Sequence, residues 1–427
     1  MVFAIVLMIA VNFVSTVRAE LIAGADMSHL VFFEQLGKSY LDNNQTNDAI
    51  LILKNHGLNC IRLRLFTSSS LQAAKDPYNY INNLDYTLPL AARVKNAGLK
   101  LLLDFHYSDT WADPAHQFKP STWTNLTFEE LKTQVRLYTS NCLVKLGANN
   151  AVPDFVQIGN EITGGFLWPD GDVRNYNDTP QQWMKFGQLL KNAIAGVSDA
   201  RLPKPPKILI HIDQGGNWKT ARWFFDNLLQ QKVEFDIIGL SYYPWWHGSF
   251  DDLQNCLTNA STRYQKPIFI VETAFPWTNS TPIFGLSASP SGQIEFIKTL
   301  IKTIKSDKTN KCFGIIWWGA EYQPLQGYNL GGYQYKSLFD HKGVVLPVVD
   351  FLGSFGSNLK LKIYYKGKEV HLKWPLSGFG LTLVRSSNLF HWTPITNEVE
   401  IGFDAFIGAR ITPESEPSEF YKLSSFQ

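Results

Sequence analysis

Short apolar runs alternate with longer amphipathic stretches between Ala23 and Trp318. Eight runs of four to seven residues are mostly apolar and are flanked by turn-forming residues, which is typical of strands buried on both faces. They cover residues 22–25, 60–65, 100–106, 155–160, 207–212, 237–242, 267–272 and 313–318. The segments between them are long enough for crossover helices. Helical patterns are clearest over residues 127–146 and, after the cap-like Asp178-Thr179-Pro180, over 179–197.

Eight strand-helix units within roughly 300 residues predict the α/β class and a (β/α)₈ TIM barrel, whose catalytic groups sit at the C-terminal ends of the strands. We place this catalytic barrel at residues 20–353. A doubly wound sheet is the alternative, but no Gly-rich phosphate loop follows the first strand.

After Phe355 the pattern changes to short alternating runs separated by Gly, Pro, Ser and Asn. These runs predict strands without helices, and about 70 residues suffice for a small antiparallel sandwich. We therefore expect a small C-terminal all-β, sandwich-like accessory domain at residues 356–427. The segment 386–393, together with 420–423, resembles small β modules appended to secreted bacterial enzymes. Such a module could bind carbohydrate, tether the enzyme or act as a spacer.

The N-terminus is apolar from Met1 to Val14 and is followed by a small-x-small pattern ending at Ala19. This predicts a signal peptide over residues 1–19, cleaved near Ala19, and a secreted protein that is extracellular or at the cell surface. No basic residue precedes the apolar run, so a single membrane anchor is the alternative. No other apolar run approaches the roughly 20 residues that span a bilayer, and we expect no further membrane contact.

The amino-acid composition limits the kinds of molecule that the protein is expected to bind. The net charge is +2 and no long run of Lys or Arg occurs, which argues against nucleic acid. Aromatic residues make up 14% of the chain, and their exposed faces can hold the apolar faces of sugar rings. No CxxC or His-rich cluster suggests a metal, and we expect no cofactor. Of the four cysteines, Cys60 suits a buried thiol, while three disulfide connectivities remain possible for Cys60, Cys142, Cys256 and Cys312.

Polar residues gather at the C-terminal ends of the predicted strands. Isolated polar groups would be costly inside an apolar barrel, so this placement predicts that they line one active site. In chain order they are Arg62, Arg64, Asp104, His106, Asp109, Asn160, Glu161, His211, Asp213, Tyr242, Tyr243, Glu272, Trp317 and Trp318.

Glu161 and Glu272 end the fourth and seventh strands, so they should face each other across the barrel mouth. That geometry can hold two carboxyl groups about 5 Å apart, as a retaining glycosidase requires. We predict that Glu161 is the acid/base and Glu272 the nucleophile. Arg62 or Arg64 and a strand-six tyrosine could keep Glu272 ionised, and ionised Glu272 would raise the pKa of Glu161. Asn160 is placed to bind the sugar 2-hydroxyl.

For one further carboxylate and for the tryptophans, the sequence indicates a role in the site less clearly. Glu321, in a loop past strand eight, is a rival carboxylate. Several tryptophans follow strand ends, where about half should be packing residues. Trp111, Trp246 and above all Trp318 are our candidates for sugar contact. The remaining strand-end tryptophans are Trp123, Trp168, Trp245 and Trp277, whereas Trp218 and Trp223 lie in a helical pattern.

Five motifs carry a family resemblance. They are Gly24-Ala-Asp-Met-Ser28, the stretch 104–117 that reads DFHYSDTWADPAHQ, the stretch 157–171 that reads QIGNEITGGFLWPDG, Ser241-Tyr-Tyr-Pro244 and Val271-Glu-Thr273. Together they resemble the family 53 glycoside hydrolases, endo-β-1,4-galactanases of arabinogalactan type I. The similarity spans residues 20–350.

The resemblance implies a retaining clan A mechanism with Asn160, Glu161 and Glu272 in the roles given above. It also implies recognition of the axial 4-hydroxyl of galactose, and it makes His106 and Asp109 contributors to the site. The implied partner is β-1,4-galactan of pectin side chains, or its oligosaccharides, bound by a monomer.

The chain departs from the family at two places. The loop 273–282 lacks the Asp, His and Asn ligands with which bacterial members bind calcium, so we expect no calcium there. Strand eight ends Trp317-Trp318-Gly-Ala-Glu321 where Glu-Pro usually follows the second aromatic residue. Another clan A specificity, for β-mannan or β-glucan, and a non-catalytic carbohydrate-binding barrel therefore stay open as alternatives.

Overall fold

The computed structural model describes residues 20–307, 309, 311–366, 369–387, 389, 391–395, 399–402, 404–411 and 420–424. The predicted signal peptide, residues 1–19, lies outside these residues. Within the described part of the chain, no helix is both long and apolar enough to cross a membrane.

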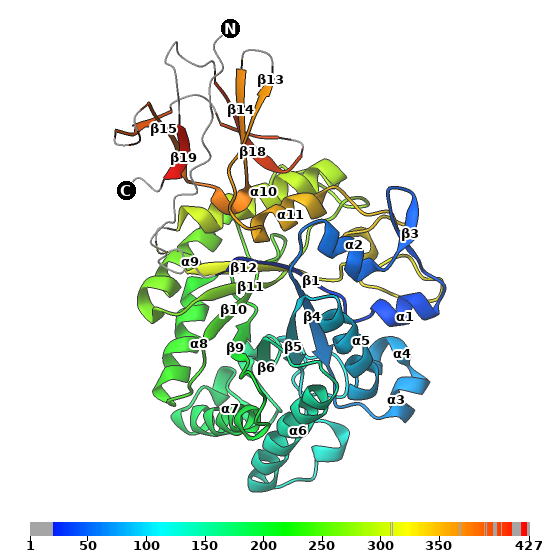
Figure 1. Ribbon diagram of the computed structural model, residues 1–427. Helices are drawn as coiled ribbons and strands as arrows, with labels where there is room; N and C mark the ends of the chain where they lie inside the picture. Colours follow the sequence, from blue (N-terminus) through cyan, green and yellow to red (C-terminus); the bar gives the residue numbers. More distant parts are fainter. Residues whose placement is uncertain are drawn as a thin grey trace.

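Eight parallel strands close into a barrel in the order β1-β12-β11-β10-β9-β6-β5-β4, which confirms the predicted (β/α)₈ fold (Figure 1). Each predicted run forms one strand, shifted by at most two residues at either end. The strands are β1 (Ile22–Asp26), β4 (Cys60–Leu65), β5 (Lys100–Phe105), β6 (Phe155–Ile158), β9 (Lys207–Ile212), β10 (Ile237–Ser241), β11 (Ile268–Thr273) and β12 (Cys312–Trp317).

Helices surround the barrel and are capped by the residues that precede them. Thr127 and Glu130 form a capping box at the start of α6, and Thr179 caps α7, close to where the sequence predicts both helices to begin. The helices are α1 (Leu30–Gln35), α2 (Ala49–Asn55), α3 (Ser70–Lys75), α4 (Pro77–Tyr80), α5 (Leu84–Asn96), α6 (Phe128–Ala148), α7 (Pro180–Asp199), α8 (Trp218–Gln230), α9 (Phe250–Tyr264), α10 (Pro290–Ser306) and α11 (Val348–Gly356). Two short ribbons, β2 (Tyr40–Asp42) with β3 (Gln45–Asn47) and β7 (Gly165–Phe166) with β8 (Gly171–Asp172), lie between barrel strands along the chain.

The barrel interior changes from apolar to polar along each strand. Side chains two residues apart point to the same face, so Cys60 and Arg62 on β4, like Leu102 and Asp104 on β5, share the interior. Cys60 and Leu102 belong to a buried apolar cluster with residues from the other six barrel strands. Arg62 and Asp104 are equally buried but pair with each other at 2.8 Å. The apolar layer thus supports a polar layer at the C-terminal ends of the strands.

The C-terminal segment forms two small antiparallel sheets, as predicted for an all-β tail. One has the order β13-β14-β18-β17 and the other β16-β15-β19. Both sheets lie beyond α10 and α11 in Figure 1, and the Leu376 amide donates to Ser354 Oγ of α11 at 2.9 Å. The bounds are β13 (Lys362–Lys366), β14 (Glu369–Pro375), β15 (Thr382–Ser386), β16 (Thr393–Pro394), β17 (Glu400–Ile401), β18 (Phe406–Ile411) and β19 (Phe420–Ser424).

All four cysteines are buried and unbonded, so none of the three disulfide connectivities forms. Cys60 lies in the interior of the barrel, as its apolar context predicts. Burial raises the pKa of each of these thiols, which keeps them in the inert, protonated form.

His56 joins α2 to the last barrel helix. Its Nδ1 lies 2.7 Å from Asp350 on α11 and its Nε2 lies 3.4 Å from Asp42 on β2. The hydrogen bond to Asp350 raises the pKa of His56 above its usual 6.5, outweighing the opposite effect of burial. Since the folded pKa is the higher one, this stabilisation is present below about pH 6.5 and is lost as pH rises through the folded pKa.

His56→Gln is therefore expected to lower Tm by about 2 °C at pH 5.5 and by less at pH 8.5, because only protonated His56 forms the ion pairs. Calorimetry at both pH values measures the difference. Asp350→Asn should reproduce the same pH dependence. An equal loss of Tm at both pH values would show that the charge of His56 does not stabilise this contact.

Candidate active site

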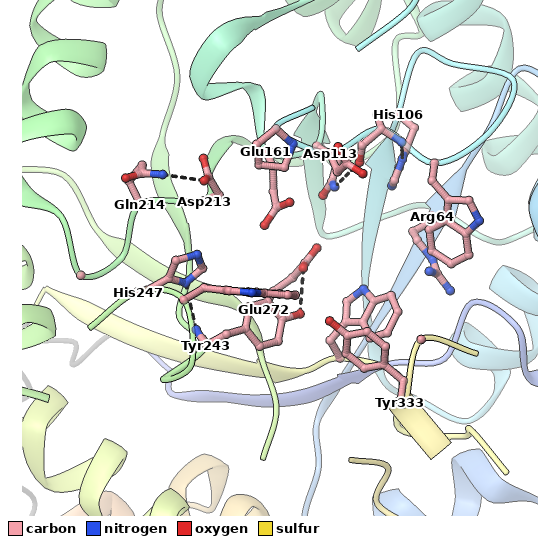
Figure 2. A pocket seen from close by; sticks show the side chains of 18 of the residues that line it. Arg64, His106, Asp113, Glu161, Asp213, Gln214, Tyr243, His247, Glu272 and Tyr333 are labelled. Atoms are coloured by element: carbon pink, nitrogen blue, oxygen red, sulfur yellow. Dashed lines mark hydrogen bonds between the residues drawn. The ribbon is translucent and has the colours of Figure 1, made fainter. Parts of the chain in front are cut away.

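A cavity of about 960 Å³ opens at the C-terminal end of the barrel (Figure 2). Polar and aromatic side chains from most of the strand ends reach it. Of the predicted residues, Arg64, His106, Trp111, Asn160, Glu161, Asp213, Tyr243, Trp246, Glu272 and Trp318 line the cavity.

Glu161 lies directly after β6 in a left-handed backbone conformation, with φ of 50°. Such a conformation is unfavourable for a residue with a Cβ, and it persists where the surroundings fix it. Here the Gln117 amide donates to the Asn160 carbonyl at 2.6 Å, and the Glu161 amide donates to His211 Nδ1 at 3.3 Å. The turn directs the Glu161 carboxyl group into the cavity, where its Oε1 accepts from Ser241 Oγ at 2.6 Å.

Glu272 lies on β11 and has a cationic partner. Its Oε1 is 2.9 Å from Arg62, and its Oε2 accepts from the Tyr243 hydroxyl at 3.0 Å. Arg62 also lies 2.8 Å from Asp26 and 2.8 Å from Asp104. Of the two arginines that the sequence offers, it is therefore Arg62 that contacts Glu272.

The two carboxyl groups have unequal environments. Burial raises the pKa of Glu272 to about 7, although Arg62 and the Tyr243 hydroxyl act to lower it. Burial, together with the negative charges of Glu272 and Asp213, raises the pKa of Glu161 well above its usual 4.5, and no cation offsets this. Figure 2 shows both carboxyl groups directed into the same space. Glu161 therefore keeps its proton to higher pH than Glu272 does, and Glu272 is the first of the two to ionise.

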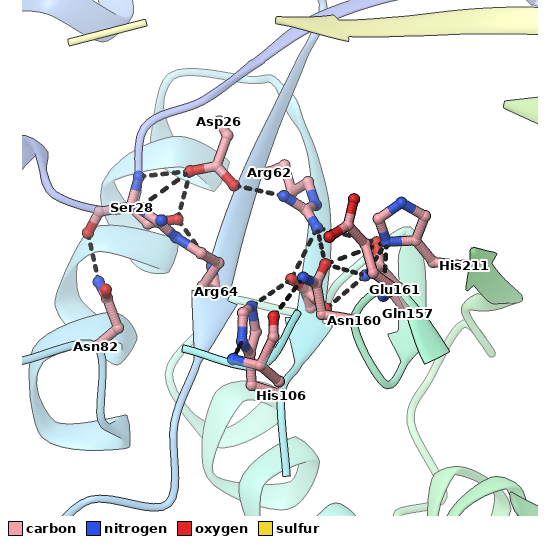
Figure 3. A network of polar contacts seen from close by, with 12 residues as sticks. Asp26, Ser28, Arg62, Arg64, Asn82, His106, Gln157, Asn160, Glu161 and His211 are labelled. Atoms are coloured by element: carbon pink, nitrogen blue, oxygen red, sulfur yellow. Dashed lines mark hydrogen bonds and ion pairs between the residues drawn. The ribbon is translucent and has the colours of Figure 1, made fainter. Parts of the chain in front are cut away.

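A buried hydrogen-bond network lies beneath the two glutamates (Figure 3). Asn160 Oδ1 accepts from Arg62 at 2.8 Å, and its Nδ2 donates to the Ala112 carbonyl at 2.8 Å. Gln157 Nε2 donates to Asp104 Oδ1 at 2.6 Å and lies 3.0 Å from His211 Nδ1. Asn160 is thereby fixed with one amide hydrogen still available toward the cavity.

Six of the residues predicted to line the site do not line the cavity: Arg62, Asp104, Asp109, His211, Tyr242 and Trp317. Arg62, Asp104 and His211 are fully buried and belong to the hydrogen-bond network beneath the cavity. Asp109 instead accepts hydrogen bonds from Thr67, Gln72 and Ser121, and so joins loops. Tyr242 points away from the cavity, and its hydroxyl donates to the Gly248 carbonyl at 3.1 Å. Arg62, Asp104 and His211 thus hold residues of the cavity in place, whereas Asp109 and Tyr242 make their hydrogen bonds outside that network. Trp317 is buried, and its Nε1 donates to the Lys336 carbonyl at 2.8 Å.

The tryptophans divide as the sequence suggests. Trp111 and Trp318 line one side of the cavity, where the Arg64 guanidinium lies 4.3 Å from the ring of Trp111 and 5.2 Å from that of Trp318. Trp246 lines the opposite side and is 65% exposed. Trp123 and Trp168 are buried packing residues. Trp218 and Trp223 lie on α8, as predicted.

Glu321 lies outside the cavity lining. It is fully buried, and its Oε1 accepts from the His29 amide at 2.7 Å. Burial raises its pKa to about 8, so the group is neutral at neutral pH. The structure therefore offers no place for Glu321 in the carboxyl pair.

Several cavity residues were missed by the sequence analysis. Tyr78, Tyr333 and His247 come from loops and short helices without a recognisable pattern, so nothing in the sequence pointed to them. Ser241 and Gln157 belong to the buried hydrogen-bond network rather than to the cavity lining. They were detectable, since each is a polar residue at an inward position of an otherwise apolar strand. Among the described residues, no group of three or more His, Cys, Asp or Glu side chains could hold a metal ion.

Comparison with known proteins agrees with this geometry. The model of glycosyl hydrolase family 53 matches residues 22–352. The chain belongs to glycosyl hydrolase family 53. A protein of Niallia circulans without an assigned activity is 41% identical over 341 residues, covering 75% of this chain and 90% of its own length. The arabinogalactan endo-β-1,4-galactanase of Humicola insolens is 34% identical, covering 72% of this chain and 91% of its own length.

Solved structures agree with the family assignment. The family 53 catalytic domain of Ignisphaera aggregans has a TM-score of 0.71 at 38% identity, covering 78% of this chain and 95% of its own. A structure of fungal β-1,4-galactanases has a TM-score of 0.70 at 32% identity, covering 78% and 99%. The similarity thus corresponds in extent to the barrel rather than to the whole chain.

The Tyr243 hydroxyl favours ionised Glu272, so its removal should raise the pKa of Glu272. We expect Tyr243→Phe to move the acid limb of the pH profile of kcat/KM to higher pH by about one unit. A hydrogen bond to a charged group contributes about 1.5–3 kcal/mol, and a water molecule can replace part of the bond that the Tyr243 hydroxyl makes. Tyr242→Phe, which removes the neighbouring hydroxyl outside the cavity, should leave the acid limb in place. If the acid limb of Tyr243→Phe stays where it is in the parent protein, Glu272 is not the group that must be ionised for activity.

Proposed function

We propose that this family 53 protein is an endo-acting β-1,4-galactanase that hydrolyses galactan or arabinogalactan with retention at the anomeric carbon. The observation that carries the proposal is the pair of buried carboxyl groups in one cavity, of which only Glu272 contacts a cation. A proton donor and an anionic nucleophile are what retaining hydrolysis requires. The names of the Humicola insolens relative and of the fungal structures support galactan as the substrate.

In the first step, Glu272 attacks the anomeric carbon while the bond from that carbon to the leaving oxygen breaks. Glu161 transfers its proton to the leaving oxygen, so the departing chain leaves as a neutral alcohol. The product is a glycosyl ester on Glu272, and Glu161 is now ionised. Asn160, held by Arg62 and Ala112, can donate its free amide hydrogen to the sugar 2-hydroxyl.

In the second step, ionised Glu161 takes a proton from water as the water oxygen bonds to the anomeric carbon. The ester bond to Glu272 breaks, which restores the ionised nucleophile and the protonated acid. Two inversions at one carbon give net retention. Arg62 remains paired with Asp26 and Asp104 throughout, so it can accept Glu272 again without rearrangement.

Contacts on both sides of the carboxyl pair support an endo mode of action. In the closed barrel, β6, which precedes Glu161, and β11, which carries Glu272, divide the other strands into two groups. Trp318 after β12 and Arg64 on β4 belong to one group, and Asp213 after β9 and Trp246 after β10 belong to the other. Aromatic faces on both sides can hold sugars before and after the bond that is cleaved. A long chain can therefore cross the site.

The test is reducing-sugar release from galactan, compared with β-mannan and carboxymethylcellulose. We expect hydrolysis of galactan, with the β-anomer formed first by NMR. Activity on mannan or carboxymethylcellulose alone would favour a different clan A specificity. Initial formation of the α-anomer would exclude the double displacement.

Glu272→Ala separates an enzyme from a carbohydrate-binding barrel. It should reduce kcat on galactan by at least about 10⁴-fold while galacto-oligosaccharide binding, measured by calorimetry, persists. Glu321→Gln is the matched control, because Glu321 is buried and neutral outside the cavity, and this variant should retain activity. Full activity of Glu272→Ala would disprove the assignment of the nucleophile.

We also propose that the protein is exported and acts on galactan side chains of pectin. The apolar segment 1–14 and the small residues ending at Ala19 support export. Expression in a secreting host should yield a mature chain whose first residue, by N-terminal sequencing, is Glu20. A chain that keeps residues 1–19 in the membrane fraction would favour the anchor.

A further inference from the structure

Three buried side chains form a row that ends on Glu161. Ser241, the last residue of β10, places its Oγ 2.6 Å from Glu161 Oε1 and 2.9 Å from His211 Nε2. Ser241 and His211 are both fully buried, so neither exchanges partners with bulk water. The strand register between β10 and β11 shifts between Leu240 and Ser241, which brings Ser241 level with Glu272. Ser241 thus reaches the acid/base from the strand next to the nucleophile.

The contacts of His211 Nδ1 determine which ring nitrogen of His211 carries the proton. The backbone amide of Glu161, which can only donate, lies 3.3 Å from His211 Nδ1, and Gln157 Nε2 lies 3.0 Å from it. Asn160 Oδ1 is also near, at 3.1 Å, but a proton on Nδ1 would oppose both N–H donors. Burial and the charge of Arg62 lower the pKa of His211 well below 6.5, so the ring is neutral. Its single proton is therefore on Nε2.

The direction of the remaining hydrogen bonds is then fixed. His211 Nε2–H donates to Ser241 Oγ, and the single hydroxyl hydrogen of Ser241 is left to donate to Glu161 Oε1. Glu161 Oε2 has no hydrogen-bond partner among the described residues and is not enclosed, so it is open to the cavity.

We infer that Ser241, oriented by His211, is a positioning residue that keeps the catalytic proton of Glu161 on Oε2, the oxygen that faces the substrate. This inference rests on the acid/base role proposed for Glu161. With the opposite tautomer, Ser241 could donate to His211, and Glu161 could then place its proton on Oε1, directed away from the glycosidic oxygen.

The row transfers no proton in either step. In the first step the proton leaves Oε2 for the departing oxygen, and the Ser241 hydrogen stays on Oγ and stabilises the carboxylate that forms. In the second step Oε2 accepts the proton from water. Ser241 and His211 thus end each step in the protonation state in which they began.

Removal of the Ser241 hydroxyl should shift the pH dependence of hydrolysis in one direction. The groups facing Glu161 are Glu272 on β11, Asp213 after β9, Asp113 after β5, and the phenols Tyr243 and Tyr333. The three carboxylates favour protonated Glu161, whereas the Ser241 hydroxyl is the side-chain donor that favours the ionised form. Loss of this hydroxyl therefore raises the pKa of Glu161, and the alkaline limb of the pH profile of kcat/KM should move to higher pH.

The experiment compares Ser241→Ala with the parent protein on galactan and on a dinitrophenyl β-galactobioside, whose leaving group needs no proton. We expect kcat/KM on galactan to fall about ten- to a hundredfold, part of the contribution of general acid catalysis. On the aryl substrate kcat/KM, which reports only the first step, should change by less than about twofold, because that step needs no acid. The alkaline limb on galactan should rise by about half a unit or more.

Two further variants separate positioning from packing. Ser241→Thr keeps a hydroxyl and should restore most of the activity on galactan. Ser261→Ala removes a different buried serine on α9, whose Oγ donates to Asp307 at 3.2 Å and which does not line the cavity; it should leave the activity on both substrates unchanged. Equal losses on both substrates in Ser241→Ala, or an unmoved alkaline limb, would overturn the inference.

The tautomer is testable without any substrate. Nitrogen NMR of labelled protein should show His211 protonated on Nε2 and unprotonated on Nδ1 between pH 5 and 8, and the opposite pattern would overturn the inference. If the parent protein hydrolyses neither β-galactoside, the proposed function fails, while the NMR result still decides the orientation of Ser241.

Discussion

The guanidinium of Arg62 organises the polar layer of the barrel. It is fully buried and lies within 2.9 Å of carboxylate oxygens from Asp26, Asp104 and Glu272, which come from three other strands. Charges withdrawn from water this completely must be paired and hydrogen-bonded, or the fold would lose several kcal/mol for each. Arg62 therefore constrains where β1, β5 and β11 place their side chains, and Glu272, the proposed nucleophile, is one of the groups it fixes.

The contrast between the two glutamates follows from this constraint. Glu272 contacts the guanidinium of Arg62, whereas Glu161 is held by the neutral donor Ser241. Both groups are raised in pKa by burial, but only Glu272 is compensated by a cation. The same buried layer thus gives the two carboxyl groups different environments. His211 and Gln157 complete the layer by fixing the direction in which Ser241 donates.

The strand positions and the placement of Glu161 and Glu272 in one cavity could be predicted from the sequence for a simple physical reason. A strand buried on both faces must be apolar, so a carboxylate at its end, such as Glu161 or Glu272, stands out against the run before it. The alternation on β4 likewise showed two arginines but could not choose between them, because both share the inward face. Only the closure of the barrel brought Arg62, rather than Arg64, to Glu272.

By itself, the sequence determined the barrel, the all-β tail and the two glutamates, since these depend on local periodicity and on polar residues placed at strand ends. The tertiary structure decided which of the flanking residues face the cavity. Tyr78 and Tyr333 reach it from short helices, Tyr242 turns away from it, and Glu321 is buried and accepts a hydrogen bond from the His29 amide. It also decided that the four thiols stay apart. These outcomes depend on contacts between residues far apart in the chain, which no local pattern records.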